Sequence, residues 1–529
     1  MKRRSISHVM QGAALLSIAS LIAKILSAVY RVPFQNMVSN TGFYVYQQVY
    51  PIYGIGMTIA LSGLPMFISK LVAETTNPGE QRALLQQVTW LLSGFSVGAF
   101  LLLQLFSATI ARGMGDLGLT PIIQSVSWMF LFAPILSVSR GFFQGHFDMV
   151  PTAVSQLIEQ VLRVSVILSV AFIAMKLHWN VYRMGSWAMS SAPVAAVFAS
   201  AVMIYYWRRS AVKKVVSQAA PVQQFSNTVI AKRVLIEGGA ISLLASMMVL
   251  LQLVDSFSVM RGLVDGGLPA MAAKALKGVF DRGQPLVQLG LVVASAFASS
   301  LLPSLTEALG RGRQLQFERL AKTVLRISLV IATAAAVGMM ALMPQINQVL
   351  FGDTSGSAAL DVYALSVIFA TLITILNSIL QSMNHYRETV IALSIGLVVK
   401  AFLNHYMVVH FGIAGASWAT VLALAAMTTL LLQRVPALKS ALLDRPFITK
   451  LIVTSGGMLL GVRLAVTLVQ SLGLTPFNSG RLDALVVIVV GIPVGGALFI
   501  WLAVKSGILT PREWLMVPYV PTLLKRLHR

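Results

Sequence analysis

The 529-residue chain contains no cysteine, which rules out a disulfide framework, a thiolate nucleophile and a thiolate-bound metal. Charged residues are scarce, at 11% of the chain against roughly 25% in a soluble domain. No Walker A loop is present, and the polar segments are too short to hold a catalytic domain. His146, His385 and His405 show no metal-ligand spacing. We therefore expect no catalytic residue, no metal site and no enzyme activity.

Apolar residues dominate the chain, at 57%, and the mean hydropathy is +0.80. The net charge of +23 would suggest nucleic-acid binding in a soluble protein. Here the cations lie mainly between apolar runs, as in positive-inside loops, so we expect no nucleic-acid partner. The fold class predicted is an all-α polytopic membrane protein. About fourteen spans are predicted, at 12–33, 46–73, 83–111, 121–145, 151–175, 185–207, 234–260, 284–309, 319–344, 358–385, 387–411, 413–435, 447–472 and 482–507.

The distribution of positive charge predicts the orientation. An even number of spans places both termini on one side of the membrane. With the N-terminus inside, cytoplasmic segments hold about three times as many Lys and Arg residues as outer segments. Both termini are therefore predicted to be cytoplasmic. The first apolar run is too long for a signal peptide and has no small-residue cleavage site, so we expect it to be retained.

The first span carries a polar stripe. Ser17, Ser20, Lys24, Ser27 and Arg31 follow one another at steps of three and four, which places them on one helix face. A cation at the bilayer centre costs about 2.5–3.5 kcal/mol. The stripe is therefore predicted to line a polar cavity, and its cations suggest an anionic cargo. The alternative, that the two cations snorkel to opposite membrane surfaces, stays open.

A weak internal repeat indicates two lobes. At an offset of 237 residues, Gln144 falls on Gln381 and Arg163 on Lys400. Six spans separate the copies, so both halves enter the membrane in the same direction, as a parallel repeat. The predicted organisation is an N-terminal six-helix lobe at 1–207, a basic cytoplasmic linker at 208–233, a C-terminal six-helix lobe at 234–435, and two extra helices with a basic tail at 436–529.

The fifth span holds an acid and a base near mid-membrane. Glu159 and Arg163 lie at i and i+4, the order that favours an ion pair, and Arg140 in the preceding span also lies within reach of Glu159. One interpretation is an internal pair that only fixes packing. The repeat favours a ligand instead, because it keeps a cation at Lys400 while Gly396 stands where the acid would be.

The seventh span carries Asp255 within an apolar run. This acid is predicted to pair with Lys24 or Arg31 or to bind a coupling cation; the alternative is a helix-end location, since Arg261 follows closely. Arg463 lies alone inside the thirteenth span, and no partner is assigned to it. The remaining candidates are polar or basic side chains that line the cavity, bond neighbouring helices or snorkel: Gln252, Asn377, Gln381 and Lys70.

Several stretches resemble one known family. They are Gly12 through Arg31, Gly63-Leu64-Pro65 with Ser69 through Glu74, and Asp281 through Gln288. They are similar to the polysaccharide-transporter branch of the multidrug/oligosaccharidyl-lipid/polysaccharide exporter superfamily, and within it to the stage V sporulation protein B and MurJ-like group. The resemblance covers nearly the whole chain, and the stretch Asp281 through Gln288 is its most specific part.

The resemblance implies a bacterial plasma-membrane flippase that alternates between inward-open and outward-open states. Its implied cargo is an undecaprenyl-linked sugar, with lipid II the leading candidate, and a groove for the lipid tail is implied on spans 447–507. The implied cavity cations are Lys24, Arg31, Lys70, Arg163, Arg261 and Lys400. Position 24 holds a lysine, whereas an arginine could bind a pyrophosphate through two parallel hydrogen bonds. The identity of the cargo therefore stays open.

The expected partners are the lipid-linked oligosaccharide, membrane lipids and envelope polymerases. No cofactor is expected apart from a coupling ion of unknown identity, for which Glu159 and Asp255 are the candidates. Two other functions stay open. A cation-coupled multidrug antiporter would need an acid-dominated cavity. A non-transporting scaffold for envelope-synthesis enzymes would tolerate the loss of Lys24, Arg31 and Arg163.

Overall fold

The structure is a computed structural model that describes residues 2–75, 77–210, 215–216, 218–220, 222, 226–291, 308–383, 385–442, 444–472 and 480–516. These residues are helical or in turns, with no strand among them. The chain forms two compact units, Met1–Gly278 and Val279–Arg529. Helix α15 (Ala270–Asp281) contains the boundary between the two units.

Eleven of the described helices are long and apolar enough to cross a membrane. Two of them, Leu15–Glu74 and Arg387–Gln433, are long enough to hold two predicted spans each. They turn at the positive-φ residues Ser39 and Gly412. The predicted span 284–309 lies largely outside the described residues. The described helices therefore match thirteen of the fourteen predicted spans, and the all-α polytopic fold is confirmed.

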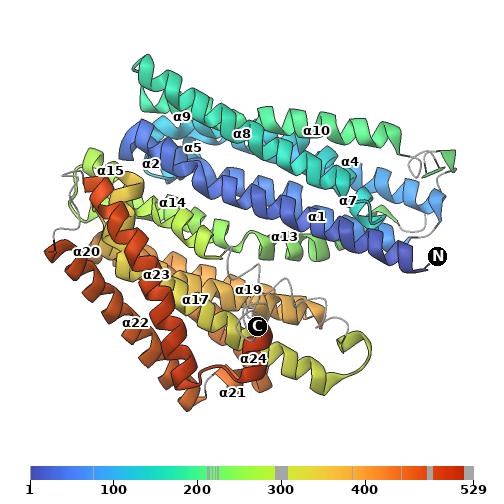
Figure 1. Ribbon diagram of the computed structural model, residues 1–529. Coiled ribbons are helices and arrows are strands. Elements are labelled where there is room, and N and C mark those ends of the chain that lie inside the picture. Colours follow the sequence, from blue (N-terminus) through green and yellow to red (C-terminus); the bar gives the residue numbers. More distant parts are fainter. Residues whose placement is uncertain are drawn as a thin grey trace. The chain divides into compact units, whose positions relative to one another are not determined.

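The first unit is a bundle around α1 and α8, which lie side by side in Figure 1. Its elements η1 and η4 are π-helical, and η2 and η3 are 3₁₀ turns. The described elements before α15 are α1 (Lys2–Val29), α2 (Arg31–Thr58), η1 (Ile59–Gly63), α3 (Leu64–Glu74), α4 (Pro78–Leu105), α5 (Ser107–Gly113), η2 (Leu117–Leu119), α6 (Thr120–Ser127), η3 (Trp128–Phe132), α7 (Ala133–Gly145), α8 (Val150–Lys176), α9 (Val181–Met189), α10 (Ser191–Arg209), α12 (Asn227–Arg233), η4 (Val234–Gly238), α13 (Gly239–Ala245) and α14 (Met247–Asp265).

Helix α2 folds back on itself and makes a helical hairpin with the end of α1. The reversal occurs at Ser39, whose φ of 64° lies in the left-handed region. Phe34, before the turn, packs edge-on against Tyr46, after it, with ring centroids 4.9 Å apart. The hairpin therefore brings Arg31, at the start of α2, opposite Tyr50.

The second unit is organised along α17, a helix of 38 residues. At 1.5 Å per residue it is about 57 Å long, nearly twice the roughly 30 Å of a hydrocarbon core. Helices α18, α19, α22 and α23 pack along it, with Phe447, Met458 and Phe499 in the shared core. The elements are α17 (Gln314–Phe351), α18 (Ser357–Ala364), α19 (Ser366–Ser382), α20 (Tyr386–Gln433), α21 (Pro436–Leu442), α22 (Arg445–Ser471), α23 (Gly480–Ser506) and α24 (Pro511–Met516).

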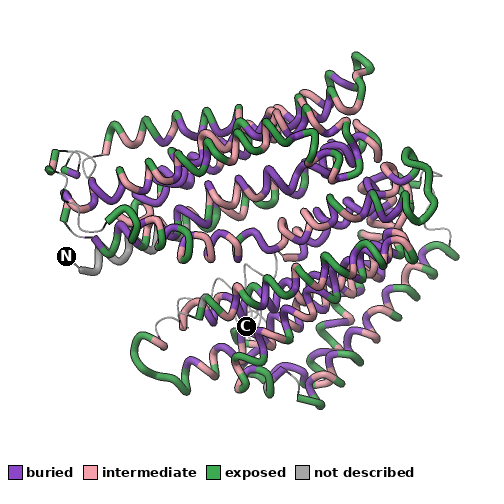
Figure 2. The backbone as a smooth tube through the Cα atoms, turned by 180° about the vertical axis from the view of Figure 1, so that it is seen from behind, coloured by how far each residue is buried: buried purple, intermediate pink, exposed green. Residues whose placement is uncertain are grey.

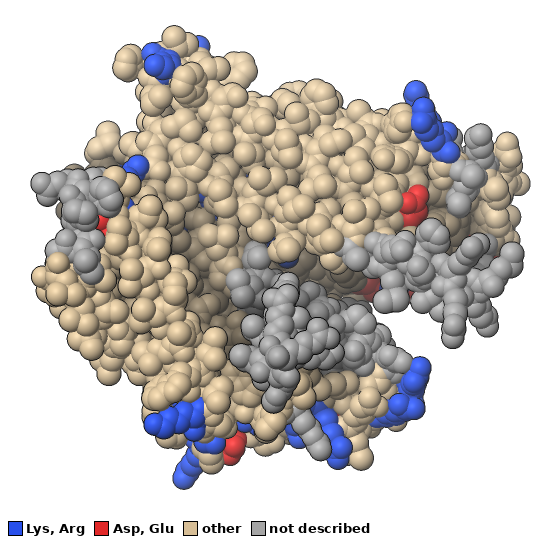
Figure 3. Space-filling model, in the orientation of Figure 1, with Lys and Arg blue, Asp and Glu red and all other residues tan. Residues whose placement is uncertain are grey.

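The surfaces of the helices fit a lipid environment. Figure 2 shows buried and exposed residues alternating along single helices, so that each has a packed face and an open face. The exposed residues include large apolar ones such as Phe402 on α20 and Leu460 on α22. In Figure 3 the visible lysine and arginine side chains gather in a few clusters separated by wide uncharged surface. This distribution is the one expected of a multi-pass membrane protein.

The predicted lobes at 1–207 and 234–435 and the helices at 436–529 remain predictions. Part of the predicted linker, 208–233, lies outside the described residues. Helix α12 lies within the predicted linker, and α13 and α14 follow it in sequence; all three belong to the first compact unit.

Candidate functional site

Two of the fully buried arginines of the first unit lie close to Ser27 and the tyrosines of α2. Arg31 begins α2 and is 2% exposed, and Arg163 lies in the middle of α8 and is 1% exposed. The side chain of Ser27, on α1, lies beside both helices, and its Oγ accepts a hydrogen bond from Nη2 of Arg163 at 3.4 Å. Three members of the predicted cationic cavity are therefore brought to one place.

Tyrosine rings surround the two guanidinium groups. The Cζ atom of Arg31 lies 4.3 Å from the ring centroid of Tyr50. The Cζ atom of Arg163 lies 4.4 Å from the ring of Tyr53 and 5.2 Å from that of Tyr30. Such contacts stabilise a cation through the negative face of the ring, by up to about 2 kcal/mol where water is excluded. Such a contact uses the face of the guanidinium and not its in-plane N–H donors.

Those donors are incompletely used. Among the described residues, Nε and Nη1 of Arg163 and Nε of Arg31 have no hydrogen-bond partner, and no carboxylate forms an ion pair with either arginine in the described part of the chain. Buried cations are ordinarily paired, because an unpaired charge in a dry interior is costly. The cluster of Ser27, Tyr30, Arg31, Tyr46, Tyr50, Tyr53 and Arg163, called the arginine–tyrosine cluster below, thus has the chemistry of an anion site.

The expected i, i+4 ion pair between Glu159 and Arg163 is not formed. Glu159 instead accepts a hydrogen bond from Nη2 of Arg140 at 2.6 Å, and both side chains are buried. Arg140 also donates to Ser155 Oγ and to the carbonyl of Ala60, in the π-helical turn η1. The reason is tertiary, since α7 places Nη2 of Arg140 against Glu159 while Arg163 contacts Ser27 on α1 and Tyr53 on α2.

The other candidates in the first unit lie in different surroundings. Lys24 is exposed on α1, one turn from Ser20 and from Ser27. The Ser20 hydroxyl donates to Oε1 of Gln156 at 3.1 Å. Asp255 is buried on α14, and Oε1 of Gln252 on the same helix is buried without a hydrogen-bond partner among the described residues.

The two remaining cations of the first unit have partners of their own. Lys70 forms ion pairs with Glu237 at 3.0 Å and Glu74 at 4.0 Å. Nη2 of Arg261, which is exposed, donates to the carbonyl of Arg112 at 2.7 Å. Neither residue belongs to the arginine–tyrosine cluster.

The candidates of the second unit are described separately. Lys400 is fully buried on α20, and its Nζ donates to Thr420 Oγ1 at 2.9 Å. Asn377 is buried and Gln381 half-buried on α19. Arg463 is exposed on α22 and interacts electrostatically with Asp361 on α18.

Sequence reasoning missed the tyrosines. Tyr46, Tyr50 and Tyr53 follow at steps of four and three, the same helical spacing that marked the polar stripe. Tyr30 completes the set, and its hydroxyl lies 3.1 Å from that of Tyr46. The helical spacing of these tyrosines can be read from the sequence. The hairpin turn at Ser39, which cannot, is what places their rings against the arginines.

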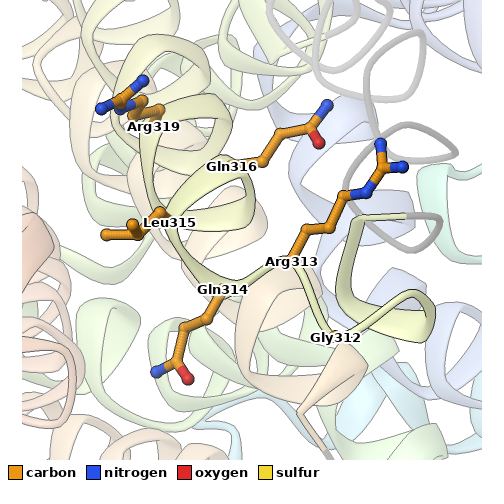
Figure 4. A pocket seen from close by; sticks show the side chains of 6 residues that line it. All are labelled: Gly312, Arg313, Gln314, Leu315, Gln316 and Arg319. Atoms are coloured by element: carbon orange, nitrogen blue, oxygen red, sulfur yellow. The ribbon is translucent and has the colours of Figure 1, made fainter.

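A separate hollow of about 650 Å³ lies at the start of α17. Figure 4 shows its side chains coming from the preceding loop and the first turns of this helix. They include Arg313 and Arg319 but none of the predicted site residues.

Comparisons with known proteins agree with this architecture. Residues 9–309 match the family described as polysaccharide biosynthesis protein. The uncharacterized membrane protein YabM of Bacillus subtilis is 34% identical, covering 98% of this chain and 96% of its own length. The lipid II flippase MurJ of the same organism is 26% identical, covering 95% of this chain and 96% of its own length.

Solved structures share the fold. A structure titled lipid II flippase MurJ, inward closed conformation, has a TM-score of 0.68 at 15% identity and covers 93% of this chain and 99% of its own. An inward-facing multidrug resistance MATE family transporter of the MOP superfamily has a TM-score of 0.64 at 15% identity, covering 81% of this chain and 99% of its own. These two likenesses concern the fold alone.

Proposed function

This chain belongs to the polysaccharide biosynthesis protein family, and on that premise we propose that it is a flippase for an undecaprenyl-pyrophosphate-linked sugar. The cargo would move from the inner to the outer leaflet by alternating access, with lipid II the leading candidate. The observation that carries the proposal is the pair of buried arginines without a carboxylate partner in the described residues. The MurJ relative, similar over nearly the whole chain, supports the same class of cargo.

The physical task fits these residues. A pyrophosphate head group cannot cross hydrocarbon unaided, because its charges must lose their hydration. Arginine offers a planar fork of donors that suits phosphate oxygens. In the proposed cycle, Arg31 and Arg163 replace part of the lost hydration, and Lys24, exposed one to two turns away on α1, meets the head group first.

The proposal includes a membrane orientation, partners and an energy source. Both termini lie in the cytoplasm of a bacterial cell, the chain delivers its cargo to envelope polymerases, and the membrane potential contributes about 2.3 kcal/mol per charge per 100 mV. Asp255 is the candidate for a coupling ion, since Glu159 is already neutralised by Arg140. The tail groove is proposed on α22 and α23.

Complementation tests this function. Cells depleted of their lipid II flippase would express the wild-type chain or Arg31→Gln/Arg163→Gln at equal membrane levels. Arg209→Gln is the matched control, because Arg209 also lies over a tyrosine ring, that of Tyr205 at 4.4 Å, but is exposed. Rescue by the wild type and the control, with failure of the double variant, supports the proposal.

The other outcomes have distinct meanings. Rescue by all three chains would keep the flippase function and reject the arginine–tyrosine cluster as its site. Failure of all three would reject lipid II as cargo and direct the same assay to other lipid-linked oligosaccharides. Drug resistance conferred by the wild-type chain would favour the antiporter. If the chain is a non-transporting scaffold, the double variant should support normal growth of a strain whose growth depends on this chain.

A further inference from the structure

Two aspartates occupy matching places in the two units. Asp116 follows the third span and Asp353 the ninth, at an offset of 237 residues. Each closes a turn by accepting from the backbone N–H two residues on: Gly118 at 3.1 Å and Ser355 at 2.8 Å. Each also binds a cation of its own unit: Asp116 binds Lys274 of α15, and Asp353 binds Arg282, the residue after α15.

The two ion pairs differ in geometry. Arg282 is completely buried, and its Nη1 and Nη2 donate to the two carboxylate oxygens of Asp353, each at 2.8 Å. Nη1 also donates to Oδ1 of Asn347 at 2.9 Å. Lys274 meets Asp116 Oδ2 with a single donor at 2.9 Å, and its side chain is 17% exposed. A bidentate arginine is held by geometry as well as charge, whereas a lysine is a mobile point charge.

The chain leading into Lys274 is poorly packed. Residues 264–272 are all exposed, and Met271 is 70% exposed. Beyond it, Ala273, Lys277 and Phe280 are buried. A segment with few buried contacts opens locally at low cost. The stretch 266–274, called the strap below, is held at its end, where Lys274 contacts Asp116 and the Tyr182 hydroxyl.

The strap ends beside the hairpin that carries the arginine–tyrosine cluster. Tyr44, just after the hairpin turn, donates to Asp116 at 3.3 Å. Gly278, one turn beyond Lys274, approaches the backbone of Asn40 so closely that a Cβ would collide with the Asn40 carbonyl. Fastening the strap therefore immobilises the turn that positions Arg31.

We propose that the strap is a releasable latch: the Lys274–Asp116–Tyr182 contact opens to free the α1–α2 hairpin, while Arg282–Asp353 stays closed. Release is needed because Arg31 and Arg163 are covered in this structure, and the fold is known in inward-closed and inward-facing states. The inference rests on the proposed transport cycle but not on the identity of its cargo.

Spin-label distances test the latch directly, because the chain has no cysteine of its own. Labels at Leu117→Cys and Met271→Cys use two exposed positions outside the ion pair. The expected result is a second, longer distance that becomes dominant on adding Asp116→Asn, while Asp353→Asn leaves the distribution unchanged. A single distance that Asp116→Asn does not alter would overturn the latch.

Crosslinking connects the latch to transport. A short, reducible thiol crosslinker between Leu117→Cys and Met271→Cys should lower the flipping rate by about tenfold or more, as expected when the required state is kept unpopulated, and reduction should restore it. The same reagent on Leu117→Cys alone is the control. Full activity of the crosslinked protein would overturn the latch. If the spin labels show two distances but the protein flips no lipid, the flippase proposal is rejected and the latch proposal is retained.

Discussion

Arg163 in the first unit and Lys400 in the second lie 237 residues apart in sequence and are both buried in their helices. Their surroundings differ. Arg163 lies on tyrosine rings with two N–H groups unpaired, whereas Lys400 donates to Thr420. At the same offset, the Arg140–Glu159 ion pair is replaced by Asn377 and Gly396. Each half of the predicted repeat thus has a buried cation, but the two cations lie in different surroundings.

The largest contrast should be in stability. Arg140→Met leaves the buried Glu159 carboxylate without its partner, so we expect a loss of about 3–5 kcal/mol in unfolding free energy. Asn377→Leu at the matching position should change it by less than about 1 kcal/mol, because Oδ1 of Asn377 has no hydrogen-bond partner among the described residues. Thermal unfolding in detergent measures both.

A control separates lost charge pairing from lost packing. Arg140→Met/Glu159→Met removes both charges, and most of the stability should return, since apolar replacements of a buried pair are often nearly neutral. Equal losses in the single and double variants would mean that Arg140 acts through its bonds to Ser155 and Ala60.

The second contrast is in transport. Arg163→Gln should lower the flipping rate about 10- to 100-fold, the range for lost hydrogen bonds to a charged group. Lys400→Gln should cost less, because Thr420 keeps its own bond to the Ala416 carbonyl. Reconstituted vesicles with a fluorescent lipid-linked sugar give both rates. Equal losses would place the anion site in both units.

The third contrast concerns the missing acid. Gly396 faces Met427, whose side chain occupies the space where a Cβ would lie. Gly396→Ala should therefore destabilise the chain by about 1–3 kcal/mol through overpacking. Gly94→Ala, in a span with open space around it, should instead gain up to about 1 kcal/mol. If Gly396→Ala is neutral, packing does not explain why the second unit lacks the acid.

The smallest contrast is in acid sensitivity. The hydrogen bond from Arg282 lowers the pKa of Asp353 from 3.8 to about 2. A lowered pKa in the folded state stabilises the fold above pH 3.8, and this contribution is lost as the pH falls towards 2. Asp353→Asn should remove that part of the acid unfolding profile. The effect is small because the Asp353 side chain is 40% exposed.

Much of the fold was predictable because its signals are local. Apolar runs long enough to cross a membrane gave the spans, and helical spacing placed Ser27 and Arg31 on one face. The turn at Ser39 was not predictable, because a positive φ is usually recognised in a sequence by a glycine, and here a serine adopts it. The choice of Arg140 over Arg163 as partner of Glu159 depends on where α7 packs. Tertiary geometry therefore decides which arginine pairs with Glu159.

The length of α17 has a mechanical consequence. A rigid rod of about 57 Å that is tilted by 10° about one end moves its other end by about 10 Å. Because α18, α19, α22 and α23 pack along this rod, they share its rotation. A small tilt of α17 about one end would therefore displace basic side chains such as Arg319, in the first turns of the helix, far more than residues near the pivot.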